Sequence, residues 1–362
     1  MINPSLGSMI QIAAQNGKLD AVALELLRRT GLSEVRVLDY TPLLGGNPVM
    51  SQVFRIRITG SGGIPRSVIM KLPAKSPVDR ARESANGSYQ REIEVYRMLS
   101  DMQGGFQPRI LSELFDPDTG NAALLIEDLG RLPSRHEFTI GVVRDALAGL
   151  AEVHARFWGD SELGAASWMR DGYRADIFNE DTSGFSSNWE ALSTSTSLHP
   201  CNHPIVNEVG SYLSDHLLEV LDELDARPCT LTHGDLHTEN MMLRRNGATV
   251  EPVLIDWQDA VYSGATSDVA KFLATTLSPE IAEVYFEELI DFYYRALNAD
   301  VRTDYAFSSF RRDVMLALLG TFANYVICAT TEIAEGVDTS SVNRSLKSVS
   351  AVINVVRPLD AL

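Results

Sequence analysis

The spacing of apolar positions divides the chain into a strand-rich part and a helical part. Residues 89–100 repeat apolar positions at helical spacing, and so do residues 20–30. No such pattern occurs over residues 73–88, which are expected to form a flexible connection. Short stretches of β-branched or alternating apolar residues, separated by turns with glycine and proline, predict strands at 33–40, 51–58, 66–72, 109–115 and 122–128.

From residue 139 onward the apolar spacing is mostly helical, and only residues 229–258 interrupt it with short strands. The longest helical patterns cover residues 142–158, 205–224, 279–297 and 311–329. Because strands and helices are segregated instead of alternating, the sequence predicts an α+β protein with a domain at 1–128 and another at 129–362.

Composition narrows the function classes. The 362 residues carry a net charge of −17, from 48 acidic and 31 basic side chains, which argues against a nucleic-acid partner. Residues 55–97 differ, with nine basic and four acidic residues. This basic segment is either a phosphate-binding region or a solvated face.

Targeting signals are not evident in the sequence. The first residues lack the basic and apolar regions of a signal peptide, and we expect no uncharged apolar run long enough to span a bilayer. None of the three cysteines forms a C-x-x-C pair, so no disulfide framework or zinc site is indicated. We therefore expect a cytoplasmic protein without a membrane partner.

The segment LTHGDLHTENMM, residues 231–242, has the side chains that phosphoryl transfer requires. Asp235 precedes Asn240 by five residues, and Asp256 follows sixteen residues later at the end of a short apolar run. Transfer from ATP uses a carboxylate beside the attacking hydroxyl, and an amide and a second carboxylate that hold Mg²⁺. The residue types and their spacing match the H-x-D-x-x-x-x-N pattern followed by a strand-borne Asp.

Two other interpretations of this segment stay open. On a strand, His233, Asp235 and His237 would share a face and could ligate the metal of a hydrolase. Alternatively, the segment is a polar loop without chemistry, in which His233 is a hydrogen-bonded core residue.

The kinase interpretation requires a lysine on an upstream strand and a glutamate on the helix that follows. VIMKLP supplies Lys71, and a buried strand lysine is unusual without a partner. YQREIEVYRML supplies Glu92, which lies one helical turn from Tyr96, with Glu94 as the alternative.

These motifs, together with LLIEDLG, LAEVHARFW, VLIDWQD and SDVAKFL, span about residues 71–273. The chain resembles the protein-kinase-like small-molecule phosphotransferases, a superfamily that includes aminoglycoside phosphotransferases, choline kinases and ecdysteroid-kinase-like proteins. The resemblance implies a bilobal fold, with a nucleotide-binding N-lobe at 1–128 and a C-lobe at 129–362 that carries the catalytic loop and the acceptor pocket.

The resemblance also implies individual roles. Asp235 is the expected catalytic base, and Asn240 and Asp256 are the expected Mg²⁺ ligands. Lys71 would contact the phosphates of ATP and pair with Glu92. Asp268 either braces the catalytic loop or is a favourable acid at a helix start. The remaining expected nucleotide contacts are Ile126, Glu127, Asp128 and Leu129 at the adenine, and Ser51 with the Gly45–Gly46 turn at a phosphate, although this turn can equally be an ordinary hairpin.

A small-molecule acceptor is favoured over a protein substrate. Asp256 is followed by Trp-Gln instead of Phe-Gly, no A-P-E motif occurs, and Gly234 replaces the arginine of H-R-D. We expect an ATP- and Mg²⁺-dependent kinase that phosphorylates a hydroxyl of a small molecule. The alternatives are a catalytically silent nucleotide-binding pseudokinase and a metal-dependent hydrolase.

Overall fold

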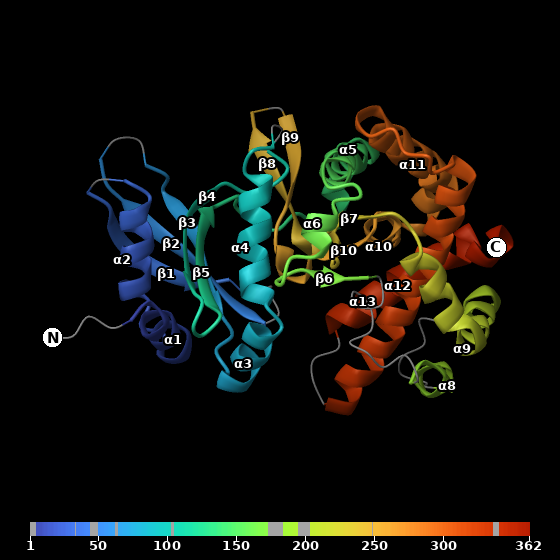
Figure 1. Ribbon diagram of the computed structural model, residues 1–362, viewed down its shortest axis with the longest axis horizontal. Helices are drawn as coiled ribbons and strands as arrows, with labels where there is room; N and C mark the ends of the chain where they lie inside the picture. The colour runs from blue at the N-terminus through green and yellow to red at the C-terminus, as the bar shows by residue number, and fades with distance from the viewer. Residues whose placement is uncertain are drawn as a thin grey trace. The chain divides into compact units, whose positions relative to one another are not determined.

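The backbone of the computed structural model forms two compact units (Figure 1). Unit 1 comprises Met1–Leu132 with Met242–Asp259, and unit 2 comprises Pro133–Met241 with Ala260–Leu362. A single cut after residue 128 does not represent this division, because a hairpin from the second half of the chain packs into unit 1. The structure describes residues 5–32, 34–43, 50–61, 64–102, 105–172, 184–194, 203–247, 249–335 and 340–362.

Unit 1 is built on a five-stranded antiparallel sheet in the order β1-β2-β3-β5-β4. Its strands are β1 Arg36–Pro42, β2 Ser51–Thr59, β3 Ser67–Pro73, β4 Ile110–Asp116 and β5 Asn121–Glu127. Its helices are α1 Leu6–Asn16, α2 Asp20–Arg29, α3 Pro77–Ala85 and α4 Ser88–Leu99. The later segment adds the hairpin β8 Met241–Asn246 and β9 Thr249–Leu254, then the 3₁₀ turn η3 Trp257–Asp259.

The two faces of this sheet have different partners, and this places Lys71. Val68, Met70 and Leu72 of β3 belong to a buried cluster that includes residues of α1 and α2. Because successive strand residues point to opposite faces, Lys71 lies on the other face. That face is the one against which α4 packs (Figure 1).

The prediction of a flexible connection at 73–88 is wrong, because α3 occupies most of this segment. Ser76 caps this helix by accepting a hydrogen bond from the Asp79 N–H at 3.3 Å, and Pro77 takes the first helical position. Both are ordinary helix-start signals. A high content of charged and polar residues concealed the helix from a search for apolar spacing.

Unit 2 is mostly helical, as expected. Its helices are α5 Ile140–Arg156, α6 Ser161–Gly164, α8 Phe185–Thr194, α9 Pro204–Asp225, α10 Thr266–Thr276, α11 Pro279–Asp300, α12 Phe307–Glu335 and α13 Ser340–Val356. Its short 3₁₀ helices are η1 Arg135–Glu137, η2 Thr238–Asn240 and η4 Pro358–Ala361. The strands β6 Arg170–Asp171, β10 Val261–Gly264 and β7 Cys229–Thr232 form one small sheet in that order. The α+β fold class is confirmed.

Helix α12 corrects one expectation. Phe307–Thr331 is long and apolar enough to cross a membrane by length and composition, although the sequence was expected to contain no such run. In the structure most of this stretch is buried. It packs against α8, α9, α10 and α13, all in unit 2. A helix that is apolar all round is typical of the centre of a large helical unit.

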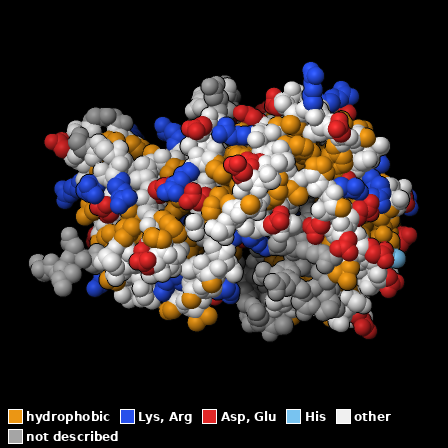
Figure 2. All heavy atoms as spheres, viewed as in Figure 1, with side chains coloured by type: hydrophobic (Ala, Val, Ile, Leu, Met, Phe, Trp, Pro, Cys, Tyr) orange, Lys and Arg blue, Asp and Glu red, His pale blue; other side chains and the backbone are white. Residues whose placement is uncertain are grey.

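The net charge of the chain comes from unit 2 alone. Unit 1 contains 17 basic and 17 acidic residues, so unit 2, with 14 basic and 31 acidic residues, carries the whole net charge of −17. Helix α9 alone has six acidic and no basic residues. Acidic side chains gather over this helix on the face shown in Figure 2.

A close approach between α8 and α9 gives a test of the packing in unit 2. A Cβ atom at Gly210 would lie 2.1 Å from Cε2 of Trp189. We expect Gly210→Ala to lower the free energy of unfolding by about 2 kcal/mol, because overpacking outweighs the helical preference of alanine.

Denaturant unfolding measures this change. Gly141→Ala on α5 is the matched control, since its Cβ would have no neighbour closer than 3.8 Å. The control should be neutral or stabilising by up to about 1 kcal/mol. Equal effects of the two variants would contradict the packing of α8 on α9.

Candidate active site

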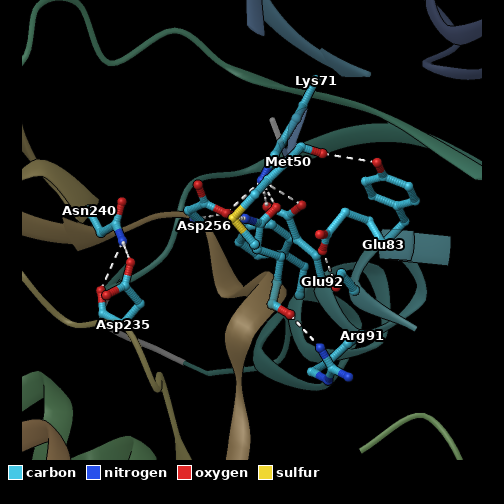
Figure 3. A network of polar contacts seen from close by, with 12 residues as sticks. Met50, Lys71, Glu83, Arg91, Glu92, Asp235, Asn240 and Asp256 are labelled. Carbon is cyan, nitrogen blue, oxygen red and sulfur yellow. Dashed lines mark hydrogen bonds and ion pairs between the residues drawn. The ribbon is translucent and has the colours of Figure 1, made fainter. Parts of the chain in front are cut away.

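Lys71 is the centre of a buried ion cluster in unit 1 (Figure 3). Its ammonium lies 2.9 Å from Oε1 and 2.8 Å from Oε2 of Glu92, and 2.6 Å from Oδ1 of Asp256. It also donates to Oε1 of Gln258 at 3.2 Å. The expected pair of strand lysine and helix glutamate therefore forms, and the carboxylate expected to hold a metal is bound to the same amine.

One cation and two carboxylates leave this cluster with an excess negative charge. Burial disfavours the charged amine, yet Asp256 and Glu92 together raise the pKa of Lys71 above its ordinary value. Burial raises the pKa of Glu92 to about 7, an effect that Lys71 opposes and the charge of Asp256 reinforces. Glu92 therefore takes up a proton at a higher pH than an unperturbed glutamate does.

The alternative glutamate, Glu94, lies outside the cluster. It pairs with Arg97 at 2.8 Å on the solvent side of α4, whereas Glu92 is only 2% exposed. The difference follows from the helical repeat, because residues two positions apart point to different sides of a helix.

Local hydrogen bonds hold Asp256 and the turn after it. Asp256 has a φ of 68°, a left-handed conformation that aspartate tolerates better than most residues. Its N–H donates to the Tyr96 hydroxyl at 3.1 Å. The Arg91 guanidinium of α4 donates to the Gln258 carbonyl at 2.5 Å. Helix α4 therefore positions the metal-ligand candidate as well as Glu92.

The acidic side chains of the expected adenine-binding segment have structural partners. Glu127 accepts the Arg109 N–H at 2.9 Å and pairs with Arg244. Asp128 binds Arg55 at 2.6 and 3.0 Å and the Ser67 hydroxyl at 2.6 Å. These contacts fix the backbone of the segment, while contact of Ile126–Leu129 with adenine stays a prediction.

A cavity of about 880 Å³ adjoins the same segment within unit 1. Glu127, Asp128 and Leu129 line one side, and Arg109 and Arg244 contribute to the rest. None of the residues of the Lys71 cluster lines it. The cavity is therefore distinct from the ion cluster.

Ser51 lies near the ion cluster. It is the first residue of β2, is buried, and lines a small cavity together with Lys71 and Glu92. The Gly45–Gly46 turn lies outside the described residues. Contact of Ser51 with a phosphate remains a prediction.

In unit 2, the H-G-D segment follows β7 as a loop. Gly234 has a φ of 79°, which only glycine adopts readily. The Asp235 N–H donates to Nδ1 of the fully buried His233 at 3.3 Å. His233 therefore shapes the loop from within the core.

Helix α10 holds this loop through Asp268. Its carboxylate accepts the N–H groups of His233 at 2.6 Å and Gly234 at 3.1 Å. It also meets Nε2 of His154 at 3.3 Å, and Nδ1 of His154 lies 2.5 Å from the Tyr293 hydroxyl. Burial opposes ionisation of Asp268, but His154 and the loop lower its pKa. Of the two roles considered for Asp268, the geometry shows loop bracing directly.

The Asp235 carboxylate has a different partner on each oxygen. Oδ1 lies 2.9 Å from the Lys271 ammonium, and Oδ2 lies 3.2 Å from Nε2 of His237. The Asn240 amide nitrogen donates to the Asp235 carbonyl at 2.9 Å and to Oδ2 at 3.3 Å (Figure 3). Burial works to raise the pKa of Asp235, but Lys271 and then His237 lower it well below its ordinary value.

The strand on which a hydrolase metal site was considered does not form. Strand β7 ends at Thr232, so His233, Asp235 and His237 lie on a loop and do not share a strand face. Within the described ranges, no group of three or more His, Cys, Asp or Glu side chains is arranged to hold a metal ion. The geometry gives the hydrolase alternative no support.

Comparison with known proteins adds an independent finding. The model of the ecdysteroid kinase-like family matches residues 168–303, and no curated protein matches the chain by sequence. Choline kinase LicA from Streptococcus pneumoniae is 15% identical, with a TM-score of 0.51 over 92% of this chain and 98% of that chain. The GDP complex of aminoglycoside 2'-phosphotransferase-IIIa is 14% identical, with a TM-score of 0.54 over 92% and 97%.

A Plasmodium vivax ethanolamine kinase is 12% identical, with a TM-score of 0.53 over 90% of this chain and 83% of that chain. The chain has the fold of the small-molecule kinases. The resemblance inferred from the motifs is confirmed, as is the expected kinase-like fold. At 12–15% identity these likenesses establish the fold, and the roles of individual residues remain predictions.

Three contacts of this kinase-like chain were missed in the sequence. Gln258 binds Lys71, and Lys271 binds Asp235. His237 binds Asp235 as a hydrogen-bond partner, although it was considered only as a metal ligand. The sequence did contain a sign of the role of Lys271. It lies one helical turn after Asp268, and the other residues of α10 are apolar or small, which indicates a buried helix.

The proton of Glu92 should give the protein a measurable pH dependence. The pKa of Glu92 in the folded chain lies above the value of 4.5 for an unperturbed glutamate. Its stabilisation is therefore complete below about pH 4.5 and is lost as the pH rises through about 7. The melting temperature of metal- and nucleotide-free protein should fall over this interval by a few degrees more than that of Glu92→Gln.

Glu94→Gln is the matched control, because Glu94 pairs with Arg97 at the surface. It should keep the wild-type pH dependence. If Glu92→Gln had the same pH dependence as wild type, the assignment of this proton to Glu92 would be wrong.

The variant Asp268→Asn distinguishes the two roles considered for Asp268, which are bracing of the loop and a favourable charge at the start of α10. An asparagine would present a donor to a loop N–H and lose a buried charge, so we expect a loss of about 3 kcal/mol in the free energy of unfolding. An acid that acted only on the helix dipole would contribute about 0.3–1 kcal/mol. Chemical denaturation measures the loss, with Asp291→Asn, which removes a surface partner of Arg295, as the control.

Proposed function

We propose that this chain is an ATP- and Mg²⁺-dependent phosphotransferase that transfers the γ-phosphate to a hydroxyl of a small molecule. The observation that carries the proposal is the buried Lys71 with Glu92 and Asp256 on one amine. Burying Lys71 and Glu92 together is costly, and buried groups with shifted pKa values concentrate at functional sites. A triphosphate is a ligand that would make use of the lysine.

The proposed roles in unit 1 concern the nucleotide. Lys71 would bind the α- and β-phosphates, with Glu92 holding its ammonium in place. The backbone of Ile126–Leu129 would meet the adenine, and Ser51 would lie near a phosphate. The structurally similar aminoglycoside 2'-phosphotransferase-IIIa was solved as a GDP complex, which supports a nucleotide as the phosphate donor. GTP is therefore included beside ATP in the test below.

The oxygen atoms of Asn240 and Asp256 suit Mg²⁺, which prefers hard oxygen ligands. The Asn240 amide nitrogen is turned toward Asp235, which leaves its carbonyl oxygen for a metal. Asp256 uses Oδ1 for Lys71, and its side chain is 28% exposed. When bound, the ion would neutralise charge on the transferred phosphate.

Asp235 would orient the acceptor hydroxyl and accept its proton. Its side chain is 39% exposed, so an acceptor can reach it. Because its pKa is lowered, Asp235 is ionised at neutral pH but weakly basic. This suits a loose transition state, in which positioning of the nucleophile contributes more than early proton removal.

ADP release with Mg-ATP is the test of this function. A panel of aminoglycosides, choline and ethanolamine, sugars, macrolides and sterols should contain an acceptor that stimulates release. We expect Asp235→Asn to lower the stimulated rate by about a hundredfold or more. Its nucleotide-induced rise in melting temperature should be retained, because the proposed nucleotide contacts are on unit 1.

Lys71→Met is the complementary variant and should lose the nucleotide-induced rise. Stabilisation by nucleotide without turnover on any acceptor would indicate the pseudokinase alternative. If neither ATP nor GTP changed the melting temperature, the proposed function would be wrong.

A further inference from the structure

Helix α10 contacts three consecutive residues of the catalytic loop with two side chains. Asp268 accepts the N–H groups of His233 and Gly234. Lys271, one turn further along, donates to the Gly234 carbonyl at 2.8 Å and lies 2.9 Å from Oδ1 of Asp235. Asp268 thus binds two N–H groups of the loop. Lys271 binds the Gly234 carbonyl and the Asp235 carboxylate.

Lys271 is unusual because of its surroundings. All eleven residues of α10 are buried, and Lys271 itself is only 9% exposed. Its ammonium also lies 5.9 Å from the centre of the Tyr325 ring. A buried ammonium requires an anion or several acceptors, and the Asp235 carboxylate provides the anion.

The contact fixes how the Asp235 carboxylate is rotated. Lys271 lies on Oδ1, whereas His237 and Asn240 lie on Oδ2. Rotating the carboxylate would break contacts on both oxygens. The amine is attached to α10, which also braces the backbone of the loop, so the loop and its reactive side chain share one support.

We propose that Lys271 is a positioning residue for Asp235, holding its carboxylate in one orientation and supplying its counter-charge. The acceptor hydroxyl then meets a carboxylate oxygen at a fixed place. This inference rests on the proposed function, because it assigns Asp235 to the acceptor. It adds a residue to the site that neither the kinase motif nor the fold comparison identifies.

The first test observes Asp235 directly and does not depend on activity. In protein with ¹³C-labelled aspartate side chains, the Asp235 resonance is assigned by its loss in Asp235→Asn. In wild type it should stay at its ionised position over the pH range in which the protein is folded. In Lys271→Met it should titrate within that range, because the counter-charge is gone.

Lys347→Met is the matched control, an exposed lysine on α13 in the same unit. It should leave the Asp235 resonance as in wild type. An unchanged resonance in Lys271→Met would overturn the proposal, whatever the result of the kinase assay.

The second test measures the pH profile of ADP release with Mg-ATP, using the stimulating acceptor or water. Lys271→Met should lower the rate roughly tenfold to a hundredfold, since small misplacements of a reacting group are costly. Its acidic limb should move to higher pH, and Lys271→Arg should restore part of the rate. A purely structural role would lower the rate equally at every pH, and that result would contradict positioning.

The two tests separate this inference from the proposed function. Absence of ADP release in wild type, with the expected shift of the Asp235 resonance in Lys271→Met, would overturn the kinase function and retain the Lys271–Asp235 coupling. Release in wild type with an unshifted resonance and an unshifted acidic limb in Lys271→Met would overturn the role of Lys271 alone.

Discussion

A buried ammonium group needs a carboxylate, and each unit of this chain is organised around one such pair. Of the lysines that the structure describes, Lys71 and Lys271 are the two that are buried. Lys71 holds Glu92 and Asp256, and Lys271 holds Asp235. Separating either lysine from its carboxylates would leave a buried charge without a partner, which costs several kcal/mol. The ion pairs therefore hold the carboxylate side chains in place. The carboxylates that the proposed chemistry needs are thus positioned by the energetics of burial.

The sequence predicted this arrangement where a local rule was sufficient. The alternation of apolar residues on β3 leaves Lys71 facing away from α1 and α2, and the helical repeat favours Glu92 over Glu94. Helix α3 was missed because its signal is a capping serine followed by proline, in a segment without apolar spacing. The pairing of Lys271 with Asp235 depends on how distant segments fold together, which periodicity does not reveal.

The two units differ in net charge. Unit 1 has no net charge, and basic residues at 55–97 are paired within it. For example, Arg55 binds Asp128, and Lys71 binds two carboxylates. Unit 2 carries the whole net charge of −17, which would raise the local concentration of cationic molecules near its surface. The negative potential would speed the encounter of unit 2 with a cationic molecule. It does not identify an acceptor, because specificity depends on contacts in the site.

The most direct test of the central claim is mass analysis of acceptor molecules after incubation with wild-type protein and Mg-ATP. The account predicts that one acceptor gains the mass of a single phosphoryl group on a hydroxyl, in equal amount to the ADP formed. It also predicts that Asp235→Asn forms about a hundredfold less of this product, or less still, in the same time. A protein that binds Mg-ATP and leaves every acceptor unmodified would contradict the account, and so would an Asp235→Asn variant that forms the product at the wild-type rate.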